Sequence, residues 1–168
     1  MLFAICGVGW LIRRDLKSAL DRLGLVKPTK RQIAMSVLFL AMMLLSNMAF
    51  ELAMRLVQPE TAAAADPTIE ALGGVTLLMA LLVSLGAGIG EETLFRGAMQ
   101  PRLGIWLTSL VFAVSHIQYM NMPIAISALF TASLIFGWER KMLNTTCCIV
   151  THISYDAVLF AAYIAAGM

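Results

Sequence analysis

Long apolar runs separated by short polar segments dominate this chain. Runs long enough to form membrane helices cover 33–57, 72–90, 105–119, 124–138 and 145–166. The segments between them carry the helix breakers Pro59, Pro67, Gly104 and Pro123. No strand-like alternation competes with this pattern, and an open sheet cannot span lipid. The pattern therefore predicts an all-α fold, a polytopic transmembrane helical bundle with about 5–6 membrane helices.

The first twelve residues are also apolar, but a helix of that length spans only ~18 Å of a ~30 Å hydrocarbon core. They lack the basic start and the small-residue cleavage site of a signal peptide. A tilted or clipped first span and a segment lying at the interface both fit. We divide the chain into an N-terminal apolar segment with a basic amphipathic cytoplasmic linker (1–32), a transmembrane helix with an acidic outer loop (33–70), and a helical bundle that holds the site (71–168).

Charge is scarce and unevenly placed. The chain is 60% hydrophobic and 13% charged, which leaves too little polar surface for a soluble domain, and its net charge of +2 does not indicate nucleic acid. Lys and Arg gather at 13–31, 102 and 140–141, whereas 58–70 has acids and no basic residue. If each helix crosses once, the basic segments share one side. The positive-inside bias assigns that side to the cytoplasm.

Ionisable side chains inside three apolar runs form the candidate site. Each costs roughly 2.5–3.5 kcal/mol at the centre of a membrane helix and therefore needs a reason. The three clusters are Glu91-Glu92-Thr-Leu-Phe-Arg96, Phe112-Ala-Val-Ser-His116 and His152-Ile-Ser-Tyr-Asp156. Glu51 and Arg55, four apart near a span end, are interpreted as a structural pair.

Helix geometry predicts that the three clusters meet. If Gly104 marks a helical hairpin, Glu91 and His116 both lie ~18–20 Å from that turn on antiparallel neighbours. His152 lies ~12 Å from a second turn on the same side. Three titratable side chains from three helices can therefore converge within the bundle.

Spacing within the clusters suggests different roles. Glu92 and Arg96 pair on one face, while Glu91 is turned by ~100° from Glu92 and faces apolar groups, as suits a general base or acid. The carboxylate of Asp156 can accept a hydrogen bond from His152 and fix its tautomer. The structural alternatives are two glutamates on one arginine, a satisfied buried histidine, and a hydrogen bond that holds helices together.

The ordered motifs Glu-Glu-x-x-x-Arg, Phe-x-x-x-His and His-x-x-x-Asp resemble the CAAX protease and bacteriocin-processing (CPBP) membrane family. The likeness covers about 78–162. It implies that Glu91 and His116 activate a water for attack on a peptide carbonyl, that Glu92 and Arg96 shape the site with Phe112 packed beside it, and that the oxyanion is stabilised by His152 and Asp156. Many members have Asn in place of Asp156. An ionised Asp cannot donate to an oxyanion, so it would have to be protonated or orient an imidazolium at His152.

The resemblance also bears on cofactor, substrate and setting. Family members are often labelled metalloproteases, and Glu91, His116 and His152 would supply three ligands of a catalytic zinc site. The His-Glu-x-x-His spacing of zincins is absent, and we favour a glutamate-based mechanism with no required cofactor. We expect a peptide or membrane-protein substrate and a multi-pass protein of a bacterial inner membrane. The alternatives are a non-catalytic immunity or scaffolding protein that binds a partner through the same cavity, and an ion or proton pathway.

Overall fold

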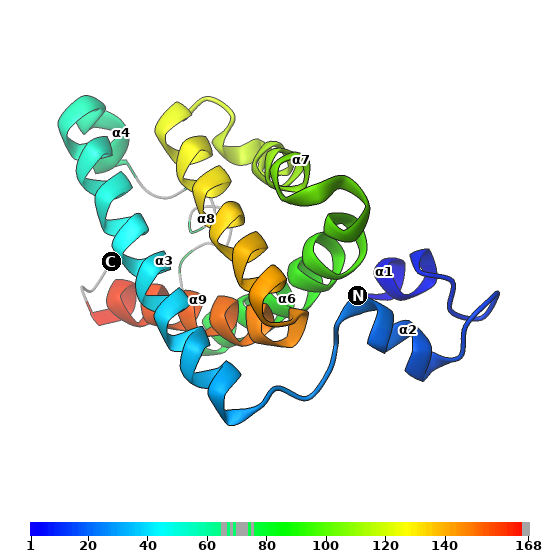
Figure 1. The fold of residues 1–168 in the computed structure, drawn as a ribbon. Helices are drawn as coiled ribbons and strands as arrows, with labels where there is room; N and C mark the ends of the chain where they lie inside the picture. Colours follow the sequence, from blue (N-terminus) through cyan, green and yellow to red (C-terminus); the bar gives the residue numbers. More distant parts are fainter. Residues whose placement is uncertain (65–66, 68, 70–73, 75, 166–168) are drawn as a thin grey trace.

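The computed structural model describes residues 1–64, 67, 69, 74 and 76–165. Within these residues the chain forms helices and no strand, which confirms the predicted all-α membrane bundle (Figure 1). The helices are α1 (Leu2–Gly7), α2 (Leu16–Leu23), α3 (Lys30–Val57), α4 (Pro59–Ala63), α6 (Leu77–Glu92), the π-helix η1 (Thr93–Met99), α7 (Gln100–Ser115), the 3-10 turn η2 (Ile117–Tyr119), α8 (Pro123–Met142) and α9 (Thr145–Ala165).

Three helical stretches of the described chain are long and apolar enough to cross a membrane: Lys30–Val57, Leu77–Ser115 and Thr145–Ala165. Large apolar side chains point outward along them, including Leu38, Leu45 and Leu82. An apolar exterior on helices of this length is what lipid requires, so this is an integral membrane protein. In contrast, α1 covers only 6 residues, so residues 1–12 do not form one continuous helix.

The chain leaves helical geometry at Gly104, where the sequence predicted a turn. Gly104 has φ 74° and ψ 174° in the middle of the stretch Leu77–Ser115. A positive φ of this kind is open to glycine and costly for other residues. The break redirects the helix, and the part of α7 beyond it packs along α8.

Two predicted boundaries were wrong. The segment 139–144 was expected to be a polar connection, but α8 continues to Met142. The reason is that Glu139 is fully buried and accepts hydrogen bonds from Ser36 on α3 and Thr151 on α9, so it belongs to the helix packing and not to a turn. The run 105–119 was expected to be one helix, but α7 ends at Ser115.

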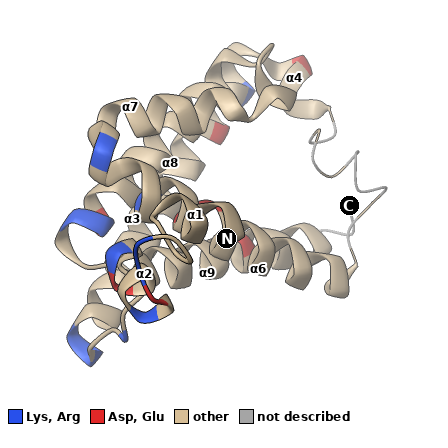
Figure 2. Ribbon diagram, turned by 90° about the vertical axis from the view of Figure 1, so that its right-hand side faces the viewer, with Lys and Arg blue, Asp and Glu red and all other residues tan. Residues whose placement is uncertain are grey.

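The basic end of the molecule packs onto the bundle through α2. Leu23 is fully buried, and its carbonyl accepts a 2.6 Å hydrogen bond from the Thr145 hydroxyl at the beginning of α9. Gly24 follows with φ 73° and closes the helix. Figure 2 shows Lys and Arg gathered around α2 and the beginning of α3. The assignment of this end to the cytoplasm stays a prediction, as does the division into three segments. Asp66 and Glu70 of the predicted acidic loop lie outside the described residues.

Candidate active site

A close approach of α6 and α9 creates the framework of the site. A Cβ added to Gly88 would lie 2.6 Å from Cγ1 of Ile153 and 3.3 Å from its backbone nitrogen. Small residues at such contacts let two membrane helices approach until polar side chains meet across them. One turn further along α6, Glu92 faces His152, the residue directly before Ile153 on α9.

Glu92 is the centre of a buried hydrogen-bond network. It is fully buried and accepts from Arg96 Nε at 3.0 Å and from His152 Nδ1 at 2.9 Å. Arg96, also fully buried, donates from Nη1 to the Ser133 hydroxyl at 3.0 Å. The predicted Glu92–Arg96 pair is therefore present in the structure. The contact between Glu92 and His152 was not predicted, because it joins residues far apart in the sequence.

His152 lies between two carboxylates and contacts them unequally. Its Nδ1 bonds Glu92, whereas Nε2 lies 3.7 Å from Asp156 Oδ2, which is longer than a hydrogen bond. An ionised carboxylate only accepts, so Nδ1 carries the hydrogen that bonds Glu92. Glu92 therefore orients the ring, a task that the sequence had given to Asp156. The ring also stacks on Phe136 at a centroid distance of 5.0 Å.

His116 is oriented by its own helix. It follows the last residue of α7, and its Nδ1 donates to the carbonyl of Phe112 at 2.8 Å. In a neutral ring Nε2 then carries the lone pair, and this atom makes no hydrogen bond to the residues that the structure describes. The Phe112 ring packs between His116, at 4.7 Å, and Phe95, at 5.0 Å, with the Arg96 guanidinium 5.1 Å above it.

The four predicted catalytic side chains line one cavity. Glu91, His116, His152 and Asp156 all border a cavity of about 610 Å³ between α3, α6, the end of α7, α8 and α9. Glu91 is half-buried and makes no hydrogen bond or ion pair with the described residues, in contrast to its neighbour Glu92. The site therefore has two layers: four side chains that line the cavity, and the buried Glu92–Arg96 pair behind them. The catalytic roles themselves stay predictions.

Three polar contacts near the site were missed by sequence reasoning. Glu139 Oε1 accepts from Ser36 at 2.9 Å and from Thr151, the neighbour of His152, at 2.7 Å. The Tyr155 hydroxyl donates to Asn47 at 2.9 Å and joins α9 to α3 at the cavity wall. Glu139 could have been found, because it follows the apolar run 124–138 directly, but the basic residues after it made the segment resemble a turn.

Binding of zinc by Glu91, His116 and His152 stays a prediction. Among the described residues no group of three or more His, Cys, Asp or Glu side chains is placed to hold a metal ion. His152 turns Nδ1 to Glu92, and His116 turns Nδ1 to its own helix. The second nitrogen of each ring makes no hydrogen bond to a described residue.

The fold and the site place this protein in the class of membrane helical bundles whose carboxylate and imidazole side chains line one shared cavity. The family model described as type II CAAX prenyl endopeptidase, Rce1-like, matches residues 73–158, a stretch that includes all three polar clusters. The chain belongs to this Rce1-like family.

The chain is also similar to one curated protein. Over 84 residues the chain is 33% identical to the uncharacterized protein YpbD of Bacillus subtilis (strain 168). The aligned stretch covers 46% of this chain and 42% of YpbD. The chain thus spans less than half of the length of this relative. No solved structure matches the chain significantly.

Proposed function

We propose that this protein is an intramembrane endopeptidase in which Glu91 and His116 activate a water molecule for hydrolysis of a peptide bond. The observation that carries the proposal is the shared cavity, which Glu91 of α6, His116 at the end of α7 and His152 of α9 line together. Membership of the Rce1-like family agrees with this chemistry.

The protein's own groups provide an acceptor for each proton. The Glu91 carboxylate and Nε2 of His116 are both free to accept, so a water between them can lose a proton as its oxygen bonds the peptide carbonyl carbon. The tetrahedral intermediate then collapses, the carbon–nitrogen bond breaks, and the proton held by the base passes to the leaving amine. The second proton of the attacking water also passes to the amine, so that water is consumed and a carboxylate and an ammonium group are formed.

His152 is the group that we assign to the oxyanion. Glu92 holds its Nδ1, so Nε2 is directed to the cavity beside Asp156. For this role His152 is an imidazolium, with Nδ1–H donating to Glu92 and Nε2–H donating into the cavity. Such a preorganised donor in a water-poor cavity stabilises the negative oxygen more than it stabilises the neutral carbonyl. The Asp156 carboxylate lies beside Nε2 and supports the positive charge of the His152 ring. The buried Glu92–Arg96 pair fixes the position of that ring. The substrate is a peptide or membrane protein, and the setting is a bacterial inner membrane with the basic end in the cytoplasm.

The test is cleavage of a set of membrane peptides by the purified protein, with and without a chelator. Glu91→Ala and His116→Ala should each abolish turnover, while the control Glu60→Ala, which removes an exposed carboxylate on α4, should leave it unchanged. Unchanged turnover in either site variant would reject the assignment. No cleavage by the wild type, together with a cellular phenotype that survives both substitutions, would favour a non-catalytic binding protein.

A further inference from the structure

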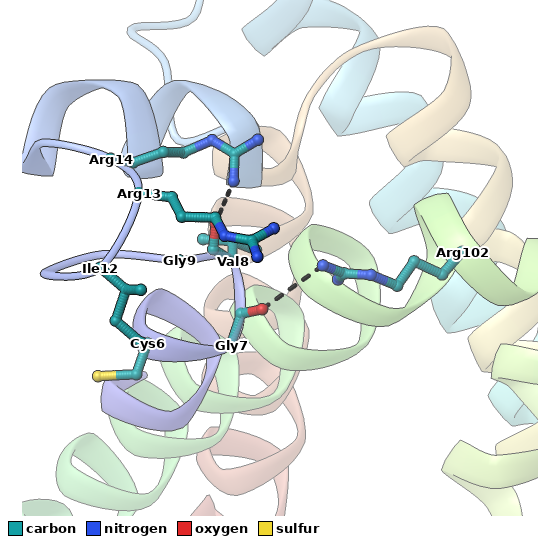
Figure 3. A pocket seen from close by; sticks show the side chains of 8 residues that line it. All are labelled: Cys6, Gly7, Val8, Gly9, Ile12, Arg13, Arg14 and Arg102. Atoms are coloured by element: carbon teal, nitrogen blue, oxygen red, sulfur yellow. Dashed lines mark hydrogen bonds between the residues drawn. The ribbon is translucent and has the colours of Figure 1, made fainter.

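A second pocket lies at the basic end of the molecule, separate from the cavity of the active site (Figure 3). Its volume is about 350 Å³. The loop after α1 and the beginning of α7 form its walls. It is lined by Cys6, Gly7, Val8, Gly9, Ile12, Arg13, Arg14 and Arg102.

Three guanidinium groups line this pocket without a counter-charge. None of the lining residues is acidic. Arg14 donates to the carbonyl of Val8, and Arg102 donates to those of Ala98, at 2.8 Å, and Gly7, at 3.5 Å. The Arg13 guanidinium makes no hydrogen bond or ion pair with any described residue, and Figure 3 shows it turned toward that of Arg102. Like charges brought together in this way favour a bound anion.

The backbone of the loop holds the arginines in place. Gly9 has φ 97° and Leu11 has φ 69°, a conformation that is uncommon for a residue other than glycine. These two positions fold the loop back on itself, so that the backbone of Trp10 meets that of Arg14 in an isolated bridge. The pocket is therefore formed by a defined loop and does not depend on chance contacts of long side chains.

The surroundings of the pocket indicate a lipid rather than a soluble ligand. Phe3 is 91% exposed, Leu11 76% and Ile12 83%, so large apolar side chains surround a basic pocket. Apolar and basic residues side by side are typical of segments that lie at the membrane interface. Arg102 lies two residues before the break at Gly104, at one end of a predicted membrane helix, which places the pocket near the level of the headgroups.

We propose that this pocket binds the phosphate of an anionic phospholipid headgroup. The planar guanidinium of Arg13, which is free of protein partners, and that of Arg102 would each donate to the phosphate oxygens, the pairing in which arginine is strongest. The acyl chains of the lipid would lie beside the exposed side chains of α1 and its loop. The bound lipid would hold α1 at the bilayer surface.

The test is lipid binding by the detergent-purified full chain, measured as the affinity for the first lipid molecule retained in native mass spectrometry. We expect phosphatidylglycerol to bind more tightly than phosphatidylcholine. Arg13→Gln should weaken phosphatidylglycerol binding about fivefold, the factor that corresponds to ~1 kcal/mol per basic residue at an anionic surface. Since the Arg13 side chain makes no hydrogen bond or ion pair with a described residue, this variant should fold normally. The matched control Lys30→Gln/Arg31→Gln removes two exposed charges outside the pocket and should change the affinity less.

A second measurement locates the lipid. Cys6 is the exposed one of the three free cysteines, and it lines the pocket. Phosphatidylglycerol should therefore slow maleimide alkylation of Cys6 in the wild type more than in Arg13→Gln. Equal loss of affinity in the Arg13 variant and the control would overturn the proposal, because it would show only general charge attraction. Displacement of the lipid by millimolar inorganic phosphate at constant ionic strength would also overturn it, in favour of a soluble phosphate ligand.

Discussion

Replacing each of the two adjacent glutamates with alanine should lower stability by very different amounts. Glu92 is fully buried and accepts from both Arg96 and His152, whereas Glu91 is half-buried without a described partner. Glu92→Ala removes both charge-assisted hydrogen bonds and leaves the Arg96 guanidinium buried without its carboxylate. Breaking a buried pair in this way costs about 3–5 kcal/mol. Glu91→Ala breaks no such contact and should cost less than about 1 kcal/mol.

These costs can be read as shifts of the thermal midpoint in detergent. For a chain of this size 1 kcal/mol corresponds to about 2–4 °C, so Glu92→Ala should lower the midpoint by roughly 6–20 °C and Glu91→Ala by less than about 4 °C. The measurement is far-UV circular dichroism at one fixed scan rate, because membrane proteins often unfold irreversibly. Glu92→Gln, which keeps the shape and loses the charge, should fall between the two. Equal shifts for Glu91→Ala and Glu92→Ala would refute the division into a cavity wall and a buried support.

Three further predictions follow from close contacts and buried groups. Gly88→Ala should destabilise the protein by about 1–3 kcal/mol and reduce turnover, because the new Cβ would overlap α9. Its control is Gly86→Ala, whose Cβ would meet nothing within 4 Å and which should change neither stability nor turnover. Thermal unfolding and the cleavage assay test both variants. Glu139→Ala should cost about 1–3 kcal/mol, because it leaves two buried hydroxyl groups without their acceptor. Glu139→Gln should cost less, because the amide oxygen still accepts. The thermal midpoints of the two variants test this order. Gly104→Ala should cost about 1–3 kcal/mol, because φ 74° with ψ 174° is a conformation that is essentially restricted to glycine. A thermal midpoint equal to that of the wild type would contradict this interpretation of the turn.

Much of the fold was readable from the sequence because lipid restricts the choices. Long apolar runs must become helices in a bilayer, and Gly104 stood out as the break between two of them. The Glu92–Arg96 pair was also readable, because it depends only on local helix spacing. The family followed from the order of three polar clusters along these helices.

The partner of His152 could not be read in the same way. Local spacing offered Asp156 four residues away, but the structure gives the short hydrogen bond to Glu92 on another helix. That contact depends on how closely α6 and α9 approach, which Gly88 permits and no local rule reports. Glu139 was missed for a related reason, since only the packing of three helices shows that a carboxylate next to two basic residues points inward.

The most direct test of the central claim is a double-mutant cycle on kcat/KM for Glu91→Gln and His116→Gln. If both side chains act on the same water, either substitution alone removes the activation, and the double variant should lose little more activity than the worse single variant. Independent losses that multiply in the double variant would show that Glu91 and His116 act separately. That result would contradict a shared catalytic cavity.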